Sequence, residues 1–218
     1  MKKLSLISFL PLLLLFVSCG SSGSKTGSES ATAESTETTG DAPMVAAKKY
    51  GIKSGIVTFE SDGMGIKSKV VLYFDDFGAK EAEEKYDDEN NIKSSELCDG
   101  TNRYTIIYKD KAAYKYGECG RGVAYRFDWN EMSGADQKYN AKKLSNVSIA
   151  GKDSESFSLE SSGNTIIYAG WNNVCLLIDQ TTQFGPVTYK AVSFEENPTI
   201  PEGKLSIPAG FEIKQPGI

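Results

Sequence analysis

The chain contains no histidine among its 218 residues. This absence excludes a Ser-His-Asp triad, a Cys-His pair, a histidine general base and a histidine-ligated metal site. Positive charge is also scarce, because 24 Lys and Arg stand against 29 Asp and Glu, for a formal net charge of −5. A basic patch is the electrostatic footprint of proteins that bind nucleic acid or anionic headgroups, so the composition argues against both kinds of partner.

Patterns for metals and catalysis are missing as well. There is no Cys-x-x-Cys pair and no zinc-type spacing. The acidic runs Asp75-Asp76 and Asp87–Asn91 lack the glycine that an EF-hand loop needs at its sharp turn, so we interpret them as solvated turns. We therefore expect no metal, no cofactor and no enzyme activity. The alternative is a hydrolase that uses two carboxylates roughly 5–9.5 Å apart, a pair that a sequence does not locate.

Long apolar runs are confined to the N-terminus, where Lys2 and Lys3 precede an apolar run from Leu4 to Val17. A bilayer-spanning helix needs about 20 apolar residues, so this run is typical of a signal peptide. It ends in Phe-Val-Ser-Cys-Gly, which resembles the lipobox of bacterial lipoproteins, whose cysteine is diacylated and becomes the new N-terminus. We predict a signal peptide over residues 1–18 and lipidation of Cys19. The alternative is an ordinary secretory signal with a chance cysteine.

Lipidation at Cys19 would make the mature chain a membrane-anchored protein that does not span the bilayer. Two or three acyl chains such as palmitate, at about 0.8 kcal/mol per buried methylene, bind a membrane almost permanently. Gly20, where an aspartate would stand in retained lipoproteins of enteric bacteria, favours the outer membrane by analogy. We therefore expect a lipid-anchored protein of the cell envelope, located at the outer membrane, on either its periplasmic or its surface face.

A linker follows the predicted anchor. Residues 19–47 consist mostly of Ser, Thr, Gly, Ala and Glu and contain no aromatic residue. Such a composition buries too little apolar area to offset the entropy of ordering the chain. A flexible segment of about 28 residues has a root-mean-square span of roughly 30 Å. We interpret it as a solvated linker that holds the domain away from the lipid surface; the alternative is a tail that binds a partner.

The remaining residues, 48–218, are predicted to form one all-β domain. Alternating, β-branched or aromatic runs recur at short intervals between turn residues, and no heptad or longer repeat is present. Nine or ten strands at this spacing are typical of a sandwich or a barrel. The predicted strands are Ile52–Glu60, Ile66–Phe74, Tyr104–Tyr108, Ala112–Tyr116, Val123–Phe127, Phe157–Leu159, Thr165–Ala169, Val174–Asp179 and Val187–Phe194. The aromatic residues either fill the core or line a cavity for an apolar ligand.

Two stretches are ambiguous. Ala79–Tyr86 is rich in Glu, Lys and Ala and favours a helix by propensity, although it could continue a hairpin. Asn130–Leu144 is polar and is predicted to be a loop with a short helix. Turns are predicted at Ser61–Gly63, Asp110-Lys111 and Asn172-Asn173, where residues that favour turns cluster.

Three cysteines remain if Cys19 carries lipid. Cys98 and Cys119 flank the hairpin that turns at Asp110-Lys111, so they could approach each other, and an exported compartment permits a disulfide. Whether they are bridged or free stays open. Cys175 lies within an apolar strand and is expected to be a small buried hydrophobic residue.

Several segments of the domain, in order, are similar to one protein family. The segments are Tyr50–Val57, Leu72–Gly78, Ile149–Lys152, Ala169–Trp171 with Val174–Ile178, and Ile207–Phe211. They resemble uncharacterised Bacteroidetes-type lipoproteins and periplasmic proteins of the lipoprotein-localisation (LolA/LolB-like) half-barrel type. The resemblance implies one strongly curved antiparallel sheet of about 9–11 strands, with one to three short helices on its concave side. It also implies an apolar cavity that can hold acyl chains, and no catalysis.

The sequence thus leads to two functional hypotheses. The first is a non-catalytic binding module or carrier for a hydrophobic ligand, a lipid or a lipoprotein, anchored in the cell envelope. The second is a structural or adhesive surface lipoprotein whose β-sandwich binds protein or glycan. One wrapped sheet favours the first hypothesis, and two stacked sheets favour the second.

Overall fold

The computed structural model describes residues 48–216 apart from 64, 120–140, 162 and 183. These residues belong to one of the two compact units of the chain, Met44–Ile218. The predicted signal peptide, Cys19 and the linker lie outside the described residues. The elements in chain order are β1 (Gly55–Gly63), β2 (Ile66–Asp75), η1 (Asp76–Gly78), β3 (Lys80–Tyr86), β4 (Ile92–Cys98), β5 (Asn102–Ile107), β6 (Ala112–Glu118), β7 (Lys142–Lys143), β8 (Val147–Ile149), β9 (Lys152–Ser161), β10 (Asn164–Trp171), β11 (Val174–Thr182), β12 (Gly185–Glu196) and β13 (Glu212–Lys214).

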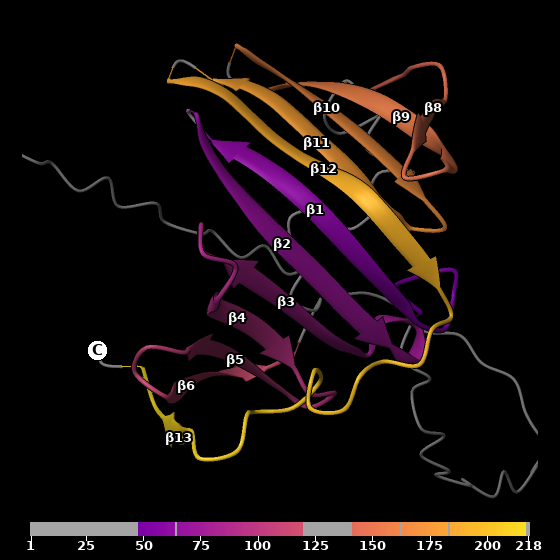
Figure 1. The fold of residues 1–218 in the computed structure, drawn as a ribbon. Helices are drawn as coiled ribbons and strands as arrows, with labels where there is room; N and C mark the ends of the chain where they lie inside the picture. The colour runs from indigo at the N-terminus through magenta and orange to yellow at the C-terminus, as the bar shows by residue number, and fades with distance from the viewer. Residues whose placement is uncertain (1–47, 64, 120–140, 162, 183, 217–218) are drawn as a thin grey trace, which may run out of the picture. The chain divides into compact units, whose positions relative to one another are not determined.

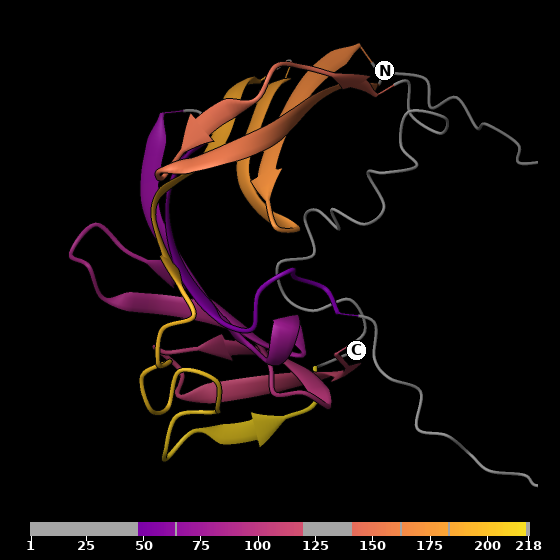
Figure 2. The same ribbon diagram turned by 90° about the vertical axis from the view of Figure 1, so that its right-hand side faces the viewer.

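The strands form one sheet. Its order is β13-β6-β5-β4-β3-β2-β1-β12-β11-β10-β9-β7, and β8 pairs with β9. Neighbouring strands are antiparallel except for β13, which runs parallel to β6. Figures 1 and 2 show that the sheet bends strongly about β1, β2 and β12 without closing into a barrel. The predicted curved antiparallel sheet is confirmed, and the alternative of a β-sandwich is wrong, because one hydrogen-bonded path connects both halves.

The details of the prediction differ from the structure in two respects. The described residues form a sheet of 13 strands, more than the 9–11 expected. The extra strands include β7, β8 and β13, which are too short to leave a pattern in the sequence. Of the expected short helices, the described residues contain only the 3₁₀ turn η1. The predicted strand Val123–Phe127 and most of the predicted loop at Asn130–Leu144 lie outside the part that the structure describes.

The helix favoured at Ala79–Tyr86 is wrong, because this segment forms β3. Its backbone pairs with β2 on one side and β4 on the other. Alternate residues therefore face opposite sides of the sheet, and Glu81, Ala82, Glu83 and Glu84 are all buried. Sheet pairing and burial outweigh the weak helix propensity of Glu, Lys and Ala.

Two of the predicted turns are confirmed, and one is misplaced. Lys111 adopts a positive φ of 46° at the turn between β5 and β6, and Asn172 and Asn173 adopt φ values of 47° and 62° between β10 and β11. Positive φ at both central residues is the geometry of a tight hairpin turn, which asparagine tolerates. The turn predicted at Ser61–Gly63 comes too early, since β1 continues to Gly63.

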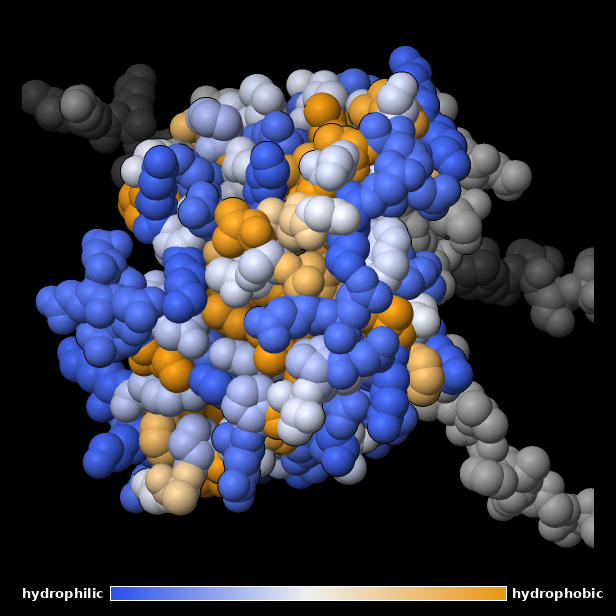
Figure 3. All heavy atoms as spheres, turned by 45° about the vertical axis from the view of Figure 1, so that its right-hand side comes forward, coloured by the Kyte–Doolittle hydropathy of each residue, from blue (hydrophilic) through white to orange (hydrophobic). Residues whose placement is uncertain are grey.

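The chain after β12 covers part of the convex side. Residues 197–211 pass over the outer face of β3–β6, and Lys204 Nζ lies 2.8 Å from Glu84 Oε1. Figure 3 views the molecule partly from this side and shows mostly hydrophilic residues, with hydrophobic ones gathered near the middle. Between this segment and the sheet lies a buried hydrophobic cluster, which consists of Ala82, Leu97, Tyr104, Ile106 and Ala113, packed against Tyr108, Leu205, Ile207 and Phe211.

Candidate functional site on the concave face

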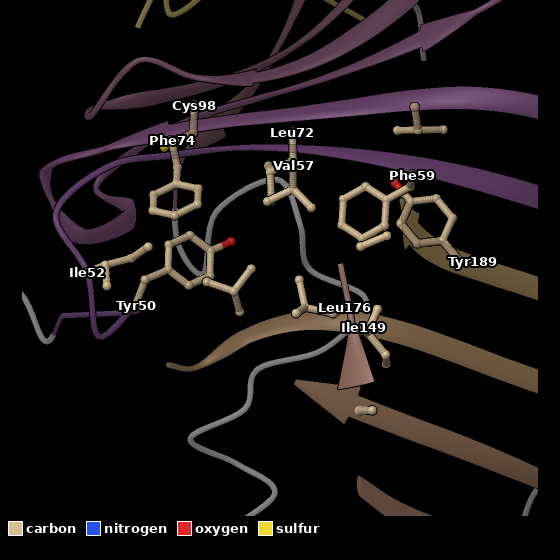
Figure 4. Packing of buried hydrophobic residues seen from close by; sticks show 14 residues of the cluster. Tyr50, Ile52, Val57, Phe59, Leu72, Phe74, Cys98, Ile149, Leu176 and Tyr189 are labelled. Atoms are coloured by element: carbon tan, nitrogen blue, oxygen red, sulfur yellow. The ribbon is translucent and has the colours of Figure 1, made fainter. Parts of the chain in front are cut away.

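The main hydrophobic cluster lies on the concave side of the sheet. Side chains that alternate along β1 and β2 point inward, and Val57 pairs with Leu72 in the register of these strands. Figure 4 shows Val57 and Leu72 pointing toward Leu176 on the opposite strand β11, and Phe74 pointing toward Tyr50. Val57, Phe74 and Leu176 are each 0% exposed. We call this the core end of the concave face, where the sheet is curved enough for facing strands to pack against each other.

Residues 49–53 close the core end. The backbone amides of Lys49 and Tyr50 donate to the carbonyl of Phe77, and that of Gly51 donates to the carbonyl of Asn172 at 2.8 Å. This segment therefore connects η1 with the turn between β10 and β11. Figure 4 shows the ring of Tyr50 beside Phe74, and their centroids are 4.3 Å apart. The side chains of this segment complete the core where the sheet alone leaves it open.

A buried ion pair holds the same segment. Lys49 Nζ lies 2.7 Å and 3.0 Å from the two carboxylate oxygens of Glu81, whose side chain is 0% exposed. Burial raises the pKa of the Tyr50 hydroxyl well above its usual 10.0, and the neighbouring charge of Glu81 and a hydrogen bond to it raise the pKa further. The tyrosine therefore stays neutral beside the ion pair, whose side chains are 12% exposed for Lys49 and 0% for Glu81.

The concave face becomes exposed toward the hairpin between β1 and β2. Along the inward residues of β12, Ala191 is 2% exposed, Tyr189 8% and Val187 37%. On β2 the exposure rises from 2% at Val70 to 72% at Ile66. The register places Val187 and Ile66 on either side of Gly63. We call Ser61, Gly63, Ile66, Ser68, Val187 and Tyr189 the open end of the concave face.

The apolar surface continues across the neighbouring strands. Ile178, Tyr168 and Phe157 stand in the same row as Tyr189 on β11, β10 and β9, and all three are half-buried. At a strand spacing of about 4.8 Å, the row from β2 to β9 is about 24 Å long. This surface offers apolar and aromatic contacts and few charges, which suits a hydrophobic ligand.

The inner face of β3–β5 is charged instead. Glu96 accepts a hydrogen bond from Thr105 at 2.8 Å and lies 3.4 Å from Arg103, and Lys85 lies 3.8 Å from Glu83. Within the described ranges, no group of three or more His, Cys, Asp or Glu side chains is arranged to hold a metal ion. The structure therefore shows these carboxylates paired with cations and a hydroxyl group.

The structure joins two of the three cysteines of the domain. Cys98 and Cys119 form a disulfide, with their Cα atoms 5.3 Å apart. The bond links the end of β4 to the residue after β6, since β5 and β6 form the hairpin between them. Cys175 forms no disulfide within the described residues and is of intermediate burial rather than fully buried, and its Sγ donates to the carbonyl of Leu177 at 3.4 Å.

Removal of this disulfide is expected to destabilise the domain. The bond closes a loop with a sequence separation of 21 residues. The chain-entropy model gives about 3 kcal/mol for a loop of this length. Urea unfolding of the Cys98→Ser/Cys119→Ser variant should show this loss. Adding a reductant should lower the unfolding midpoint of the wild type to that of the variant. The midpoint of the variant should stay unchanged. Non-reducing peptide mapping that finds both thiols free would contradict the pairing.

Alkaline pH is expected to destabilise the folded domain. Burial raises the pKa of Tyr50, Tyr73, Tyr86, Tyr108 and Tyr168 above 10.0. A group whose pKa is higher in the folded state contributes stability below its unfolded pKa, and this is lost as pH rises toward the folded value. The free energy of unfolding should therefore fall above about pH 10. Equal tyrosinate absorbance in native and urea-unfolded protein throughout the titration would contradict this.

Comparisons with known proteins support the fold alone. No family model and no curated protein matches the chain. The crystal structure of an uncharacterized conserved protein from Thermus thermophilus aligns with 75% of this chain and 90% of its own, with a TM-score of 0.51 and 8% identity. The chain thus has a fold seen in another protein, of the class built from one curved, unclosed sheet.

Two further solved structures are more distant. A crystal structure of MucB aligns with 75% of this chain at a TM-score of 0.47 and 12% identity, and 60% of the MucB chain is covered. The Pseudomonas aeruginosa MucA/MucB complex aligns with 72% of this chain at a TM-score of 0.45 and 11% identity, and 56% of that chain is covered.

Among the described residues, no helix has the length and apolar character needed to cross a membrane.

Proposed function

We propose that this protein is a non-catalytic binding module or carrier of the bacterial cell envelope that takes up a hydrophobic ligand, a lipid or the acyl part of a lipoprotein. The supporting observation is the change in exposure along the concave face. The inward residues of β2 pass from 2% exposed at Val70 to 72% at Ile66 while staying apolar at both positions. Large apolar side chains on a concave surface, next to a packed core, are typical of a site for an apolar ligand.

The proposal includes an N-terminal lipid anchor. The lipobox-like segment places Cys19 where acylation would occur, and the following linker would span roughly 30 Å. Such a tether would let the domain reach ligands close to the bilayer that anchors it. Gly20 supports the outer membrane as the location.

The anchor is tested in cells that grow on labelled palmitate. The wild-type protein should carry the label and fractionate with outer membranes, while a Cys19→Ala variant should carry none. An unlabelled wild-type protein would overturn the anchoring part of the proposal.

Ligand binding is tested with the mature chain without its anchor, residues 20–218. Native mass spectrometry should show a mass adduct of acyl-chain size that disappears on denaturation. If no adduct is present, the protein should still take up an added fatty acid. A protein that carries no adduct and takes up no fatty acid would overturn the proposed function.

A further inference from the structure

The open end of the concave face has a floor of small residues. Ser61 and Ser68 face each other across β1 and β2, and their hydroxyl oxygens are 2.8 Å apart. One of these hydroxyls therefore donates to the other, which uses one donor and one acceptor of the pair. A Cβ built on Gly63 would have no atom within 4 Å. The inward side of β1 thus has open space at Gly63 and only a short side chain at Ser61.

Large side chains stand on both sides of this low strip at Gly63, and on its β12 side at Ser61. Gly63 lies between Val187 on β12 and Ile66 on β2, and Ser61 lies beside Tyr189. Phe59 ends the strip, because its ring stacks on Tyr189 with centroids 4.5 Å apart and the two residues are 3% and 8% exposed. Figure 4 shows this stacked pair at one end of the packed cluster, away from Tyr50. The walls of the strip are apolar, and the described residues that line it carry no charge.

We propose that this strip along β1, from Gly63 to Ser61, is a subsite for the end of an unbranched alkyl chain, and that the absence of a side chain at position 63 admits it. The inference rests on the proposed function and makes it specific. At about 3.4 Å per residue, the distance from Gly63 to Phe59 is about 14 Å. The strip is about one strand wide, so a methylene chain fits along it, whereas a ring system does not. Phe59 and Tyr189 form the stop for the chain end.

Gly63 offers a substitution that separates binding from folding. It is not among the glycines with positive φ, and it has open space where a side chain would go. Leucine at this position is therefore expected to be unstrained, and it replaces a residue that weakens strands. The matched control is Glu60→Leu, which adds the same side chain to the exposed, outward side of the same strand.

The test titrates residues 20–218 with trans-parinaric acid, a fluorescent unbranched fatty acid whose methyl end is free, and records thermal unfolding of each variant. We expect Gly63→Leu to weaken binding by about tenfold or more, which corresponds to about 1.4 kcal/mol, without lowering the melting temperature. Glu60→Leu should stay within about twofold of the wild type. Should Gly63→Leu not fold, Gly63→Ala serves instead, with a smaller but measurable loss expected.

The outcomes distinguish the two proposals. If the wild type does not bind the probe, the proposed function fails. If the wild type binds and the folded Gly63 variant binds equally well, the alkyl subsite on β1 is wrong while the proposed function stands. Equal losses in the Gly63 and Glu60 variants would also overturn the subsite, because the loss would then not depend on the concave face.

Discussion

Replacing Lys49 by methionine is expected to lower the free energy of unfolding by about 3–5 kcal/mol, because it removes the cation from a buried pair. Glu81 is 0% exposed and Lys49 only 12%, and the ammonium lies 2.7 Å from the carboxylate. Burying a carboxylate without its cation costs far more than the pair contributes when intact. Urea unfolding followed by tryptophan fluorescence measures the change.

The control for this prediction is Lys53→Met in the same segment. Lys53 is exposed, so its replacement should change the free energy of unfolding by less than about 0.5 kcal/mol. Adding Glu81→Leu to Lys49→Met should restore part of the stability, since an apolar pair then replaces the ionic one. A Lys49→Met variant as stable as the control would show that the buried pair does not hold this segment.

Truncating Phe74 to alanine is expected to cost about 3–5 kcal/mol, because it opens a cavity in the packed end of the concave face. Phe74 is 0% exposed and contacts Tyr50. Its ring also covers the backbone of Gly55, where an added Cβ would lie 2.4 Å from the ring Cζ. The loss appears as a lower midpoint of chemical unfolding.

The contact between the Phe74 ring and the backbone of Gly55 provides an independent check of this packing. Gly55→Ala alone should be destabilising because its methyl group collides with the ring, by about 1–3 kcal/mol. Combined with Phe74→Leu, which shortens the side chain, it should be less harmful than the sum of the single changes. Phe184→Ala, at a residue that is 73% exposed, is the control and should have little effect. Additive losses in the double variant would contradict the packing described for Gly55 and Phe74.

Local features of the fold were predictable from the sequence where neighbouring residues carry the signal. The turn at Asn172-Asn173 follows from two residues that tolerate positive φ between two apolar runs. The strand β3 was not predictable, because its buried glutamates depend on distant partners. Glu81 pairs with a lysine 32 residues away, and Glu84 with Lys204, 120 residues away. Without those partners in view, alternating acids and lysines look like a solvated helix.

In the candidate site, too, some features follow from neighbouring residues and others depend on residues far apart in the sequence. The aromatic content of the domain raised the possibility of a cavity for an apolar ligand, but no pattern separates core aromatics from ligand-facing ones. Ser61 and Gly63 carry only a turn signal in the sequence, which does not predict their inward position in β1. The hairpin at Asp110-Lys111 did place Cys98 and Cys119 near each other, because a short antiparallel connection brings its flanks together.

The sequence alone determined that the domain is built from short strands, because the two-residue period of side chains and the turn residues between strands are local properties. It also determined the net negative charge and the absence of histidine chemistry. Only the tertiary structure decided that the sheet bends, which side is concave, and where that side stays uncovered. These properties depend on the register between strands and on segments that cover the sheet, since one face of a strand is buried only when another part of the chain packs against it.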